Sequence, residues 1–345
     1  MAAPGRRDAV LRWLWTPAII MALLLAIGVL ASIGPGSLQR TVTDALIKLI
    51  VVAGLYIFIG NTGVISFGHT AFMAIGAYMS AWLTMTPALK RIRFSDLPEL
   101  IATTQLPVLA AAPISAAAAA LVALVVGVPL MRLSGISASI GTFAMLAVVV
   151  AVYGNWSGLT GGKSSLVGVP VETDLWLALL WASVAIVIAW TFQRSRTGLL
   201  LRGSREDLVA ARASGVDVHR LRLAAFVVSA FVVGLGGHAY AHFLGVLSVD
   251  AFFLDITFIT IGMLVIGGMN SLSGAALGVI LVSVLLELVR RAEAGMSVAG
   301  IEVPSLPGLS QVVLAVVMLL ILVFRPAGLM GDREIAPPGA RRAST

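Results

Sequence analysis

The stretch SRTGLLLRGSREDLVAARASGVDVHRLRLAAF, residues 195–226, is the longest strongly polar segment between apolar spans. Within it, Ser204 followed three residues later by Asp207 fits a capping box, and Gly215 can end a helix. The spacing predicts a short helix over 205–215. Such a helix is either part of a solvated loop or a surface that a cytosolic partner grips. Seven arginines lie in or beside this stretch: Arg194, Arg196, Arg202, Arg205, Arg212, Arg220 and Arg222.

The composition of the chain indicates that its solvent is lipid. Of its 345 residues, 59% are hydrophobic and only 11% are charged, and the mean hydropathy is +1.03. No soluble domain of this size could bury so much apolar surface. The net charge of +7 does not indicate nucleic-acid binding, because the basic residues lie at the ends of apolar runs. The absence of cysteine excludes disulfides, iron–sulfur clusters and thiol catalysis.

Apolar runs along the chain predict about ten membrane-spanning helices, since a span needs about 20 apolar residues and tolerates about 17. Several runs are short, which indicates broken or re-entrant segments. The predicted fold is an all-α polytopic membrane protein, with one transmembrane domain over 1–345 and a polar tail at 326–345. The runs are Pro17–Ile33, Asp44–Gly60, Gly68–Thr84, Leu106–Val126, Ala138–Tyr153, Leu175–Phe192, Leu223–Gly245, Leu254–Gly268, Gly274–Val289 and Leu309–Phe324.

The basic residues predict the topology, because cytoplasmic loops carry an excess of lysine and arginine. Both termini and the loop at 193–222 hold arginines, so all three are predicted to be cytoplasmic, and the glycine-rich loop at 154–173 is predicted to lie outside. One loop disagrees, because Lys90, Arg91 and Arg93 then also lie outside. Either a pair of short spans is miscounted there or this loop is an exception to the rule.

Two polar, glycine-broken interruptions separate apolar runs. The first, NTGVISFGH, contains Asn61, Ser66 and His69, and the second, GGMNSLSG, contains Asn270 and Ser271. Unwound backbone at membrane depth is tolerated only where it is buried or lines a cavity, and an ionisable histidine facing lipid is costly. These five residues are therefore candidates for the translocation path. The alternatives are a tight turn at the interface for the first and a packing turn for the second.

Two motifs resemble ligand-binding sites but lack part of what such a site needs. The segment GLTGGKSS, 158–165, resembles a phosphate loop, but position 157 is a serine, no strand precedes it and it is predicted to lie outside. His238 and His242 lie on one side of a helix, as metal ligands often do, but a site needs further ligands, and hydrogen-bonded helix histidines are the alternative. No metal site and no cofactor is predicted.

The sequence contains no group of residues at a plausible site that would support catalysis or ion coupling. The sequence contains no G-x-S-x-G, no H-E-x-x-H and no paired carboxylates at such a site, so no enzyme is predicted. Besides the histidines, Lys48 and Glu287 are the candidates buried in spans, and both lie off-centre or near an end of their runs. This argues against ion coupling, so an energy source outside the chain is needed.

The chain resembles the permease subunits of high-affinity ABC importers for branched-chain amino acids, specifically the longer of the two paired permeases. Four stretches carry the resemblance, in the family's order and between about residues 50 and 290. They are Gly63-Val-Ile-Ser66-Phe-Gly68-His69 with Phe72 and Gly76-Ala77-Tyr78; Leu159-Thr160-Gly161-Gly162; Arg196-Thr-Gly198 through Phe226; and Gly267-Gly268 through Gly274.

The resemblance implies which residues meet an ATPase. In place of the general motif Glu-Ala-Ala-x-x-x-Gly, this chain has Val209, Ala210, Ala211 and Gly215, with valine for the glutamate. The implied coupling residues are Arg205, Glu206, Asp207, Ala210, Ala211, Ser214, Gly215 and Val216. The implied outer loop is Thr160, Gly161 and Gly162, followed by Lys-Ser-Ser where the family more often has Ser-Asp-Gly.

The resemblance also implies the transport complex to which the chain would belong. It would be a multi-pass permease subunit in a bacterial inner membrane, paired with a second permease, two cytosolic ATPases and an extracytoplasmic solute-binding protein. The 205–215 helix would couple it to the ATPases, and the substrates would be branched-chain amino acids. One alternative is the same machinery importing urea, short amides or other amino acids. An alternative of another class is a self-sufficient secondary transporter or channel.

Overall fold

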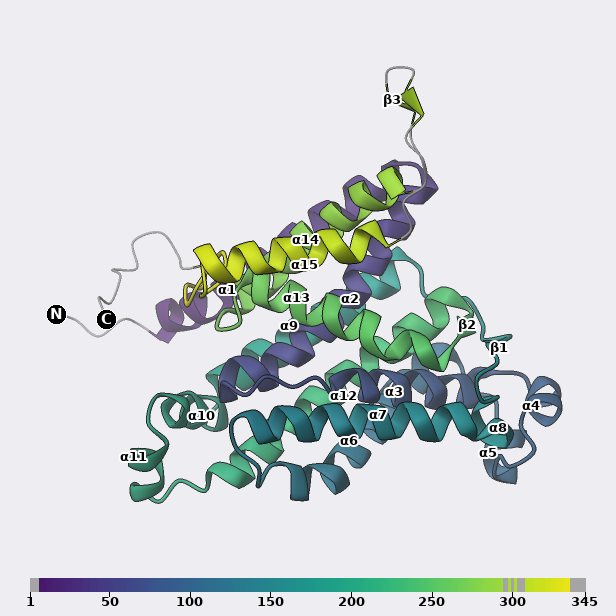
Figure 1. Cartoon of the computed structure of the whole chain (residues 1–345), viewed down its shortest axis with the longest axis horizontal. Helices are drawn as coiled ribbons and strands as arrows, with labels where there is room; N and C mark the ends of the chain where they lie inside the picture. Colours follow the sequence, from purple (N-terminus) through teal and green to yellow (C-terminus); the bar gives the residue numbers. More distant parts are fainter. Residues whose placement is uncertain (1–5, 294–296, 299–300, 303–307, 336–345) are drawn as a thin grey trace.

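A computed structural model describes residues 6–293, 297–298, 301–302 and 308–335, and they are almost entirely helical (Figure 1). Among these residues, eight helices are long and apolar enough to cross a membrane, and α15 is a shorter apolar helix. Each of the ten predicted runs falls on one helix, so the all-α polytopic prediction is confirmed. The helices are α1 (Arg6–Ile33), α2 (Gly36–Thr62), α3 (His69–Thr84), α4 (Pro87–Arg93), α5 (Glu99–Thr103), α6 (Val108–Leu130), α7 (Ile136–Asn155), α8 (Ser157–Thr160), α9 (Leu175–Arg194), α10 (Arg196–Glu206), α11 (Leu208–Ala213), α12 (Val218–Leu244), η1 (Val249–Phe252), α13 (Leu254–Gly267), α14 (Leu272–Glu293) and α15 (Leu309–Phe324).

Helix α12 occupies the centre of the bundle, packed against α2, α3 and α6. Small residues permit this close approach, which is typical of helices that pack within a membrane. A Cβ at Gly237 of α12 would collide with the carbonyl oxygen of Met73 in α3, and one at Gly76 would collide with the backbone of Gly234. The glycines of these apolar spans therefore determine how near the central helices lie.

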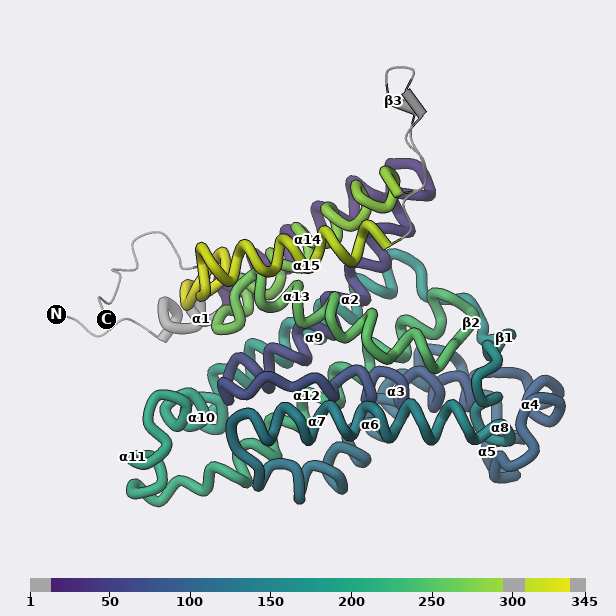
Figure 2. Tube along the Cα trace, in the orientation of Figure 1, coloured from purple at the N-terminus to yellow at the C-terminus, as the bar shows by residue number. Residues whose placement is uncertain are grey.

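The last three helices form a lobe beside this centre (Figure 2). Helices α13 and α14 touch through backbone, because a Cβ at Gly267 would collide with the carbonyl of Gly274. After α15 the chain turns back under this contact, where Leu329 N donates to Ile266 O and Met330 N donates to Gly267 O, both at 3.0 Å. The residues after α15 are therefore part of the packed structure.

The bundle has two distinct ends (Figure 1). At one end, here called the α10 end, lie α10 and α11. At the other, the α4 end, lie α4, α5, α8 and the strands β1 (Leu166–Val167) and β2 (Val246–Leu247), which pair antiparallel. Strands β3 (Ser297–Val298) and β4 (Ile301–Glu302) pair between α14 and α15. Thr16 Oγ1, in the first half of α1, donates to Ile335 O at 2.9 Å, so this part of α1 lies beside the last described residue.

The loop that conflicts with the charge rule is a compact structure and not a missed pair of spans. Its helices α4 and α5 have seven and five residues, too few to cross a bilayer. The Lys90 side chain is fully buried, and its ammonium donates to Ile101 O at 3.0 Å and to Thr104 O. Burial lowers the pKa of Lys90 from its usual value. Lys90 thus holds the loop together, while Arg91 and Arg93 are exposed.

Candidate functional site

The predicted helix over 205–215 is wrong in its bounds, because the structure has two helices there with a break at Asp207. Ser204 is not the cap: it lies inside α10 and its hydroxyl donates to Leu201 O at 2.7 Å. The cap is Asp207, whose Oδ1 accepts from Val209 N and Ala210 N, both at 2.9 Å. Of the two polar residues in the Ser-x-x-Asp box, the helix cap is therefore Asp207, three residues after the position expected from the sequence.

The short helix α11 projects from the α10 end and has no buried residue. Val209 is 79% exposed. Gly215 follows with a φ of +81°, a conformation that favours glycine, so this helix end is confirmed. The predicted coupling residues therefore lie on one projection: Arg205 and Glu206 at the end of α10, Asp207 at the break, Ala210 and Ala211 on α11, and Ser214, Gly215 and Val216 in the turn after it.

Arg202 of α10 joins the projection to the bundle. Its Nε donates to Asn61 Oδ1 at 3.0 Å, and its Nη2 donates to Tyr56 OH at 2.8 Å. The Tyr56 hydroxyl in turn donates to Gln193 Oε1 of α9 at 2.8 Å. A guanidinium can serve several acceptors at once because its donors form a planar fork. One arginine therefore ties α10 to α2 and, through Tyr56, to α9.

Arg205 makes the second connection. Its Nη1 donates to Gly60 O at 3.1 Å and to Asn270 Oδ1 at 2.6 Å, so it bridges the carboxyl end of α2 and the turn between α13 and α14. Its Nη2 pairs with Glu206 at 3.1 Å. A Cβ at Gly63 would meet the Arg205 side chain at 2.7 Å, and Gly63 also has a φ of +70°. Asn61 and Asn270, which lie far apart in sequence, are thus held by neighbouring arginines.

The residues after α15 complete this network. Glu334 caps the start of α14: its Oε1 accepts from Leu272 N at 2.8 Å and its Oε2 accepts from Ser273 N at 3.0 Å. Carboxylates stabilise a helix amino terminus, where backbone N–H groups lack partners. Ser271 Oγ also donates to Glu334 at 3.1 Å, and Asn270 Nδ2 donates to Asp332 at 2.6 Å. We use the name arginine network for Arg202, Arg205, Asn61, Tyr56, Gln193, Asn270 and Glu334.

Two other path candidates lie inside the protein between α2 and α3. Ser66 and His69 are buried, and Ser66 Oγ lies 2.7 Å from His69 Nδ1. The imidazole packs among the rings of Phe58, Phe72 and Phe226, with centroids 5.3, 5.9 and 5.3 Å away. This arrangement stabilises the turn before α3. A role of these residues in a path stays a prediction.

The outer loop is an ordered turn at the α4 end. Thr160 is buried, and its hydroxyl donates to Trp156 O at 2.8 Å while accepting from Gly162 N at 3.2 Å. Gly161 and Gly162 have φ values of +82° and +65°. Trp156 Nε1 donates to Asp96 at 3.1 Å, which joins this turn to the loop that Lys90 holds. No strand precedes the turn, so the resemblance to a phosphate loop is not supported.

A family model described as the permease component of branched-chain amino acid transport systems matches residues 37–322. The chain belongs to this family of ABC transporter permeases. The match includes α10, α11 and both glycine-broken turns, so the arginine network lies within it, apart from Glu334. The family consists of transport proteins that move solutes.

Individual relatives agree with the family model. Over 345 residues the chain is 26% identical to the high-affinity branched-chain amino acid permease protein LivM of Escherichia coli K12, covering 89% of this chain and 74% of that protein. LivM of Salmonella typhimurium LT2 gives the same identity and coverage. The autoinducer 2 import permease LsrC of an Enterobacter species is 30% identical over 165 residues, covering 45% of this chain and 47% of LsrC. No solved structure matches.

In this permease, the two helix histidines form a hydrogen-bonded chain. Ser80 Oγ of α3 lies 2.7 Å from His238 Nδ1 and 2.8 Å from His242 Nε2, and His242 Nδ1 lies 2.8 Å from Pro170 O. Within the described part of the chain, no three His, Cys, Asp or Glu side chains are placed to hold a metal ion. The pair therefore links α12 to α3 and to the segment that precedes α9.

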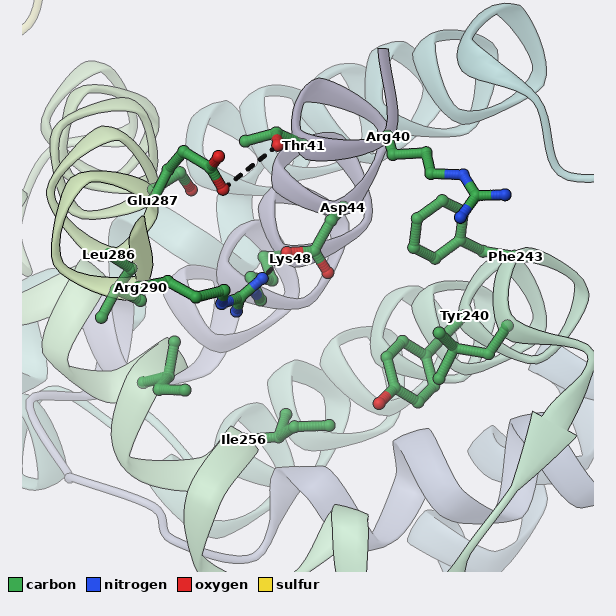
Figure 3. Close-up of a pocket in the computed structure, with 13 residues that line it drawn as sticks. Arg40, Thr41, Asp44, Lys48, Tyr240, Phe243, Ile256, Leu286, Glu287 and Arg290 are labelled. Carbon is green, nitrogen blue, oxygen red and sulfur yellow. Dashed lines mark hydrogen bonds and ion pairs between the residues drawn. The ribbon is translucent and has the colours of Figure 1, made fainter. Parts of the chain in front are cut away.

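Sequence reasoning missed a charged cavity between α2, α12, α13 and α14 (Figure 3). Helix α2 begins eight residues before the predicted run, so Lys48 lies near the midpoint of the helix. Arg40, Asp44 and Lys48 recur every four residues, which places them on one face of α2. That spacing in an apolar helix is the signal that could have identified the cavity. None of the predicted path residues lines it.

Proposed function

We propose that this permease is the transmembrane subunit of an ATP-driven importer of branched-chain amino acids, and that α11 couples it to a cytosolic ATPase. The α10 end is then cytosolic, both termini lie inside, and the α4 end receives the solute from an extracytoplasmic binding protein. A second permease and two ATPases complete the assembly, in a bacterial inner membrane. The machinery moves solute and makes no bonds.

The observation that carries the proposal is the attachment of α11. A short helix with an exposed, mostly alanine surface can seat in a groove of a partner because small side chains permit close approach. It transmits motion only if its base is fixed to the spans. Arg202 and Arg205 supply that base, since they bond to α2 and to the α13–α14 turn. Motion of the ATPases would thus reach at least two parts of the bundle at once.

The proposed solute is supported by two relatives, the LivM proteins of Escherichia coli and Salmonella typhimurium, which are high-affinity branched-chain amino acid permeases. The similarity to LsrC, a permease of an autoinducer 2 import system, favours testing other solutes too. Urea, short amides and other amino acids are the alternatives for the same machinery. Labelled leucine, urea and propionamide in competition would separate them, and the expected result is that leucine alone is taken up with high affinity.

A self-sufficient secondary transporter or channel is the competing function, and the charged residues of α2 are the observation that favours it. Lys48, near the midpoint of a helix long enough to cross a membrane, is the kind of residue that ion-coupled carriers use. Its ammonium, however, is paired with Asp44 at 2.5 Å. Ion-driven uptake by the purified chain in liposomes, without ATP or companion proteins, would establish this function and refute coupling through α11.

The decisive experiment alters the surface of α11 and leaves its base intact. In Ala210→Trp and Ala211→Trp the added bulk should prevent α11 from seating, so the ATPases should no longer co-purify and ATP-dependent uptake should fall to background. Ser32→Trp, at the α4 end, is the control and should change neither. Deletion of Glu206–Gly215 should act as the tryptophans do. Normal co-purification in the α11 variants would refute the coupling.

A further inference from the structure

The cavity of Figure 3 has a volume of about 370 Å³, within the range of roughly 300–1,000 Å³ usual for small-molecule sites. It extends from the first turns of α2, where Arg40 lies, to Lys48 near the midpoint of that helix. The other walls come from the halves of α12, α13 and α14 nearer the α4 end. The cavity therefore leads from that end into the depth of the membrane.

The cavity is lined by more positive than negative groups. Arg40, Lys48 and Arg290 face two carboxylates, Asp44 and Glu287. Within the described chain, neither Arg40 nor Arg290 forms a salt bridge, whereas Lys48 is paired with Asp44 at 2.5 Å. Both arginines are exposed. The two arginines are thus available to an incoming anionic group.

The carboxylates retain capacity for a positive group. Asp44 contacts Lys48 through Oδ2, and among the described residues nothing donates to its Oδ1. Glu287 uses Oε1 for Arg291 at 2.9 Å, and its Oε2 accepts only a long bond of 3.3 Å from Thr41. A carboxylate oxygen can accept two hydrogen bonds, so both groups can take a further donor.

Uncharged groups in the wall also lack partners. The hydroxyl of Ser283 is buried without a hydrogen-bond partner in the described chain, although buried hydroxyls normally have one. Tyr240 extends its hydroxyl into the same space from α12 (Figure 3). Apolar side chains form the remaining wall: Phe243, Leu244, Ile256, Ile259 and Leu286. The cavity thus offers positive, negative, hydroxyl and apolar surfaces to one small ligand.

We infer that this cavity is a binding subsite for a zwitterionic α-amino acid with an apolar side chain, on its way from the α4 end. Arg290 or Arg40, which lie on opposite sides of the cavity (Figure 3), holds the carboxylate, Asp44 or Glu287 holds the ammonium, and the apolar wall takes the side chain. This assignment rests on the proposed function and names the substrate class. It separates amino acids from urea and short amides, which carry no charge and cannot satisfy the arginines.

The test measures binding directly, on the assembled permeases and ATPases in nanodiscs without the binding protein. Saturation-transfer NMR detects weak ligands, and the probes are leucine, leucinamide, 4-methylpentanoate and urea. Leucine should bind, and leucinamide and 4-methylpentanoate, each lacking one charge, should bind at least about tenfold more weakly, as the loss of a charge-assisted bond implies. Urea should give no signal. Equal binding of urea and leucine would overturn the assignment.

Of the variants Arg290→Gln and Arg40→Gln, the one that removes the arginine holding the carboxylate should weaken leucine binding at least about tenfold. Tyr240→Phe removes a single hydroxyl and should weaken it a few-fold, with little risk to folding. Arg93→Gln removes an exposed arginine at the same end, outside the cavity, and is the matched control. Wild-type binding by both arginine variants would refute the subsite, as would loss of the second permease from their complexes, which would make the cavity a subunit interface.

Failure of the subsite and failure of the proposed function give different results. If the wild-type complex hydrolyses ATP and imports leucine while the arginine variants import it at the same rate, the subsite is wrong and the function stands. If the wild-type complex imports no solute with ATP, the proposed function is wrong. Leucine binding that depends on Arg290 would then still identify the cavity as an amino-acid site.

Discussion

The arginine network at the α10 end and the charged cavity nearer the α4 end both contain arginines, yet they use them differently. Arg202 and Arg205 donate to acceptors on other helices at 2.6–3.1 Å. Arg40 and Arg290 form no such bond among the described residues. A guanidinium with its donors satisfied by the protein fixes helices to each other, whereas one without partners is open to a ligand. Arginine content alone does not distinguish a joint from a binding site.

The largest expected effect is on uptake, and it comes from removing the attachment of α10 to the bundle through Arg205. Besides the pairing with Glu206, Arg205→Met removes two hydrogen bonds from a charged donor to the bundle, each worth about 1.5–3 kcal/mol, so uptake should fall at least about 100-fold. The ATPases should still co-purify, because α11 itself is unchanged, and ATP hydrolysis should continue without transport. Arg205→Lys should recover part of the uptake, since an ammonium can reach one acceptor but lacks the fork. Normal uptake in Arg205→Met would show that the network does not transmit motion.

The next effect is on stability, at the carboxylate that caps α14. Glu334→Gln removes the charge that accepts from Leu272 N and Ser273 N, and should lower the free energy of unfolding by about 1–3 kcal/mol. Thermal unfolding in detergent measures the change. Asp332→Asn is the control: Asp332 accepts from the exposed Asn270 amide and caps no helix, so a smaller effect is expected. Equal effects would show that capping is not what Glu334 contributes.

Lys90, at the α4 end, is a buried cation that donates to backbone carbonyls, and it should make the stability of the fold depend on pH. Burial lowers its pKa in the folded protein, so above that pKa the unfolded chain binds more protons than the folded one. Stability should therefore rise with pH, from the folded pKa up to the unfolded value of about 10.5, by less than about 1.4 kcal/mol per pH unit. Thermal unfolding of wild type and Lys90→Met across that range measures it. A difference that does not change with pH would contradict the prediction.

The smallest expected effect concerns the cavity arginines themselves. Because Arg40 and Arg290 bond to nothing in the described chain, Arg40→Gln and Arg290→Gln should change the free energy of unfolding by no more than about 0.5 kcal/mol. One of the same substitutions should weaken leucine binding, as argued above. A loss of stability similar to that of Glu334→Gln would show that these arginines also hold helices together. The contrast between the two regions would then not exist.

Sequence alone determined the solvent, the helical class and the positions of the spans. Apolar runs of about 20 residues need a bilayer, and a continuous run of that length satisfies its backbone hydrogen bonds in a bilayer as a helix. The order of the motifs also indicated the family, which the matches confirm over residues 37–322. The break at Asp207 could not be predicted from the sequence, because Ser204 and Asp207 both suit a helix cap. Only the length of α10 in the structure decides between them.

Tertiary structure alone decided which polar residues meet. Asn61 lies in the last turn of α2 and Asn270 in the turn between α13 and α14, and their common attachment to α10 depends on how these segments pack. Where Lys48 lies along its helix depends on where α2 begins, and whether Lys90 is a topology signal or an internal tie depends on the carbonyls around it. Side-chain charge is a property of the sequence. Whether that charge is neutralised, bonded or left for a ligand depends on distances between segments that are remote in the chain, which no local pattern encodes.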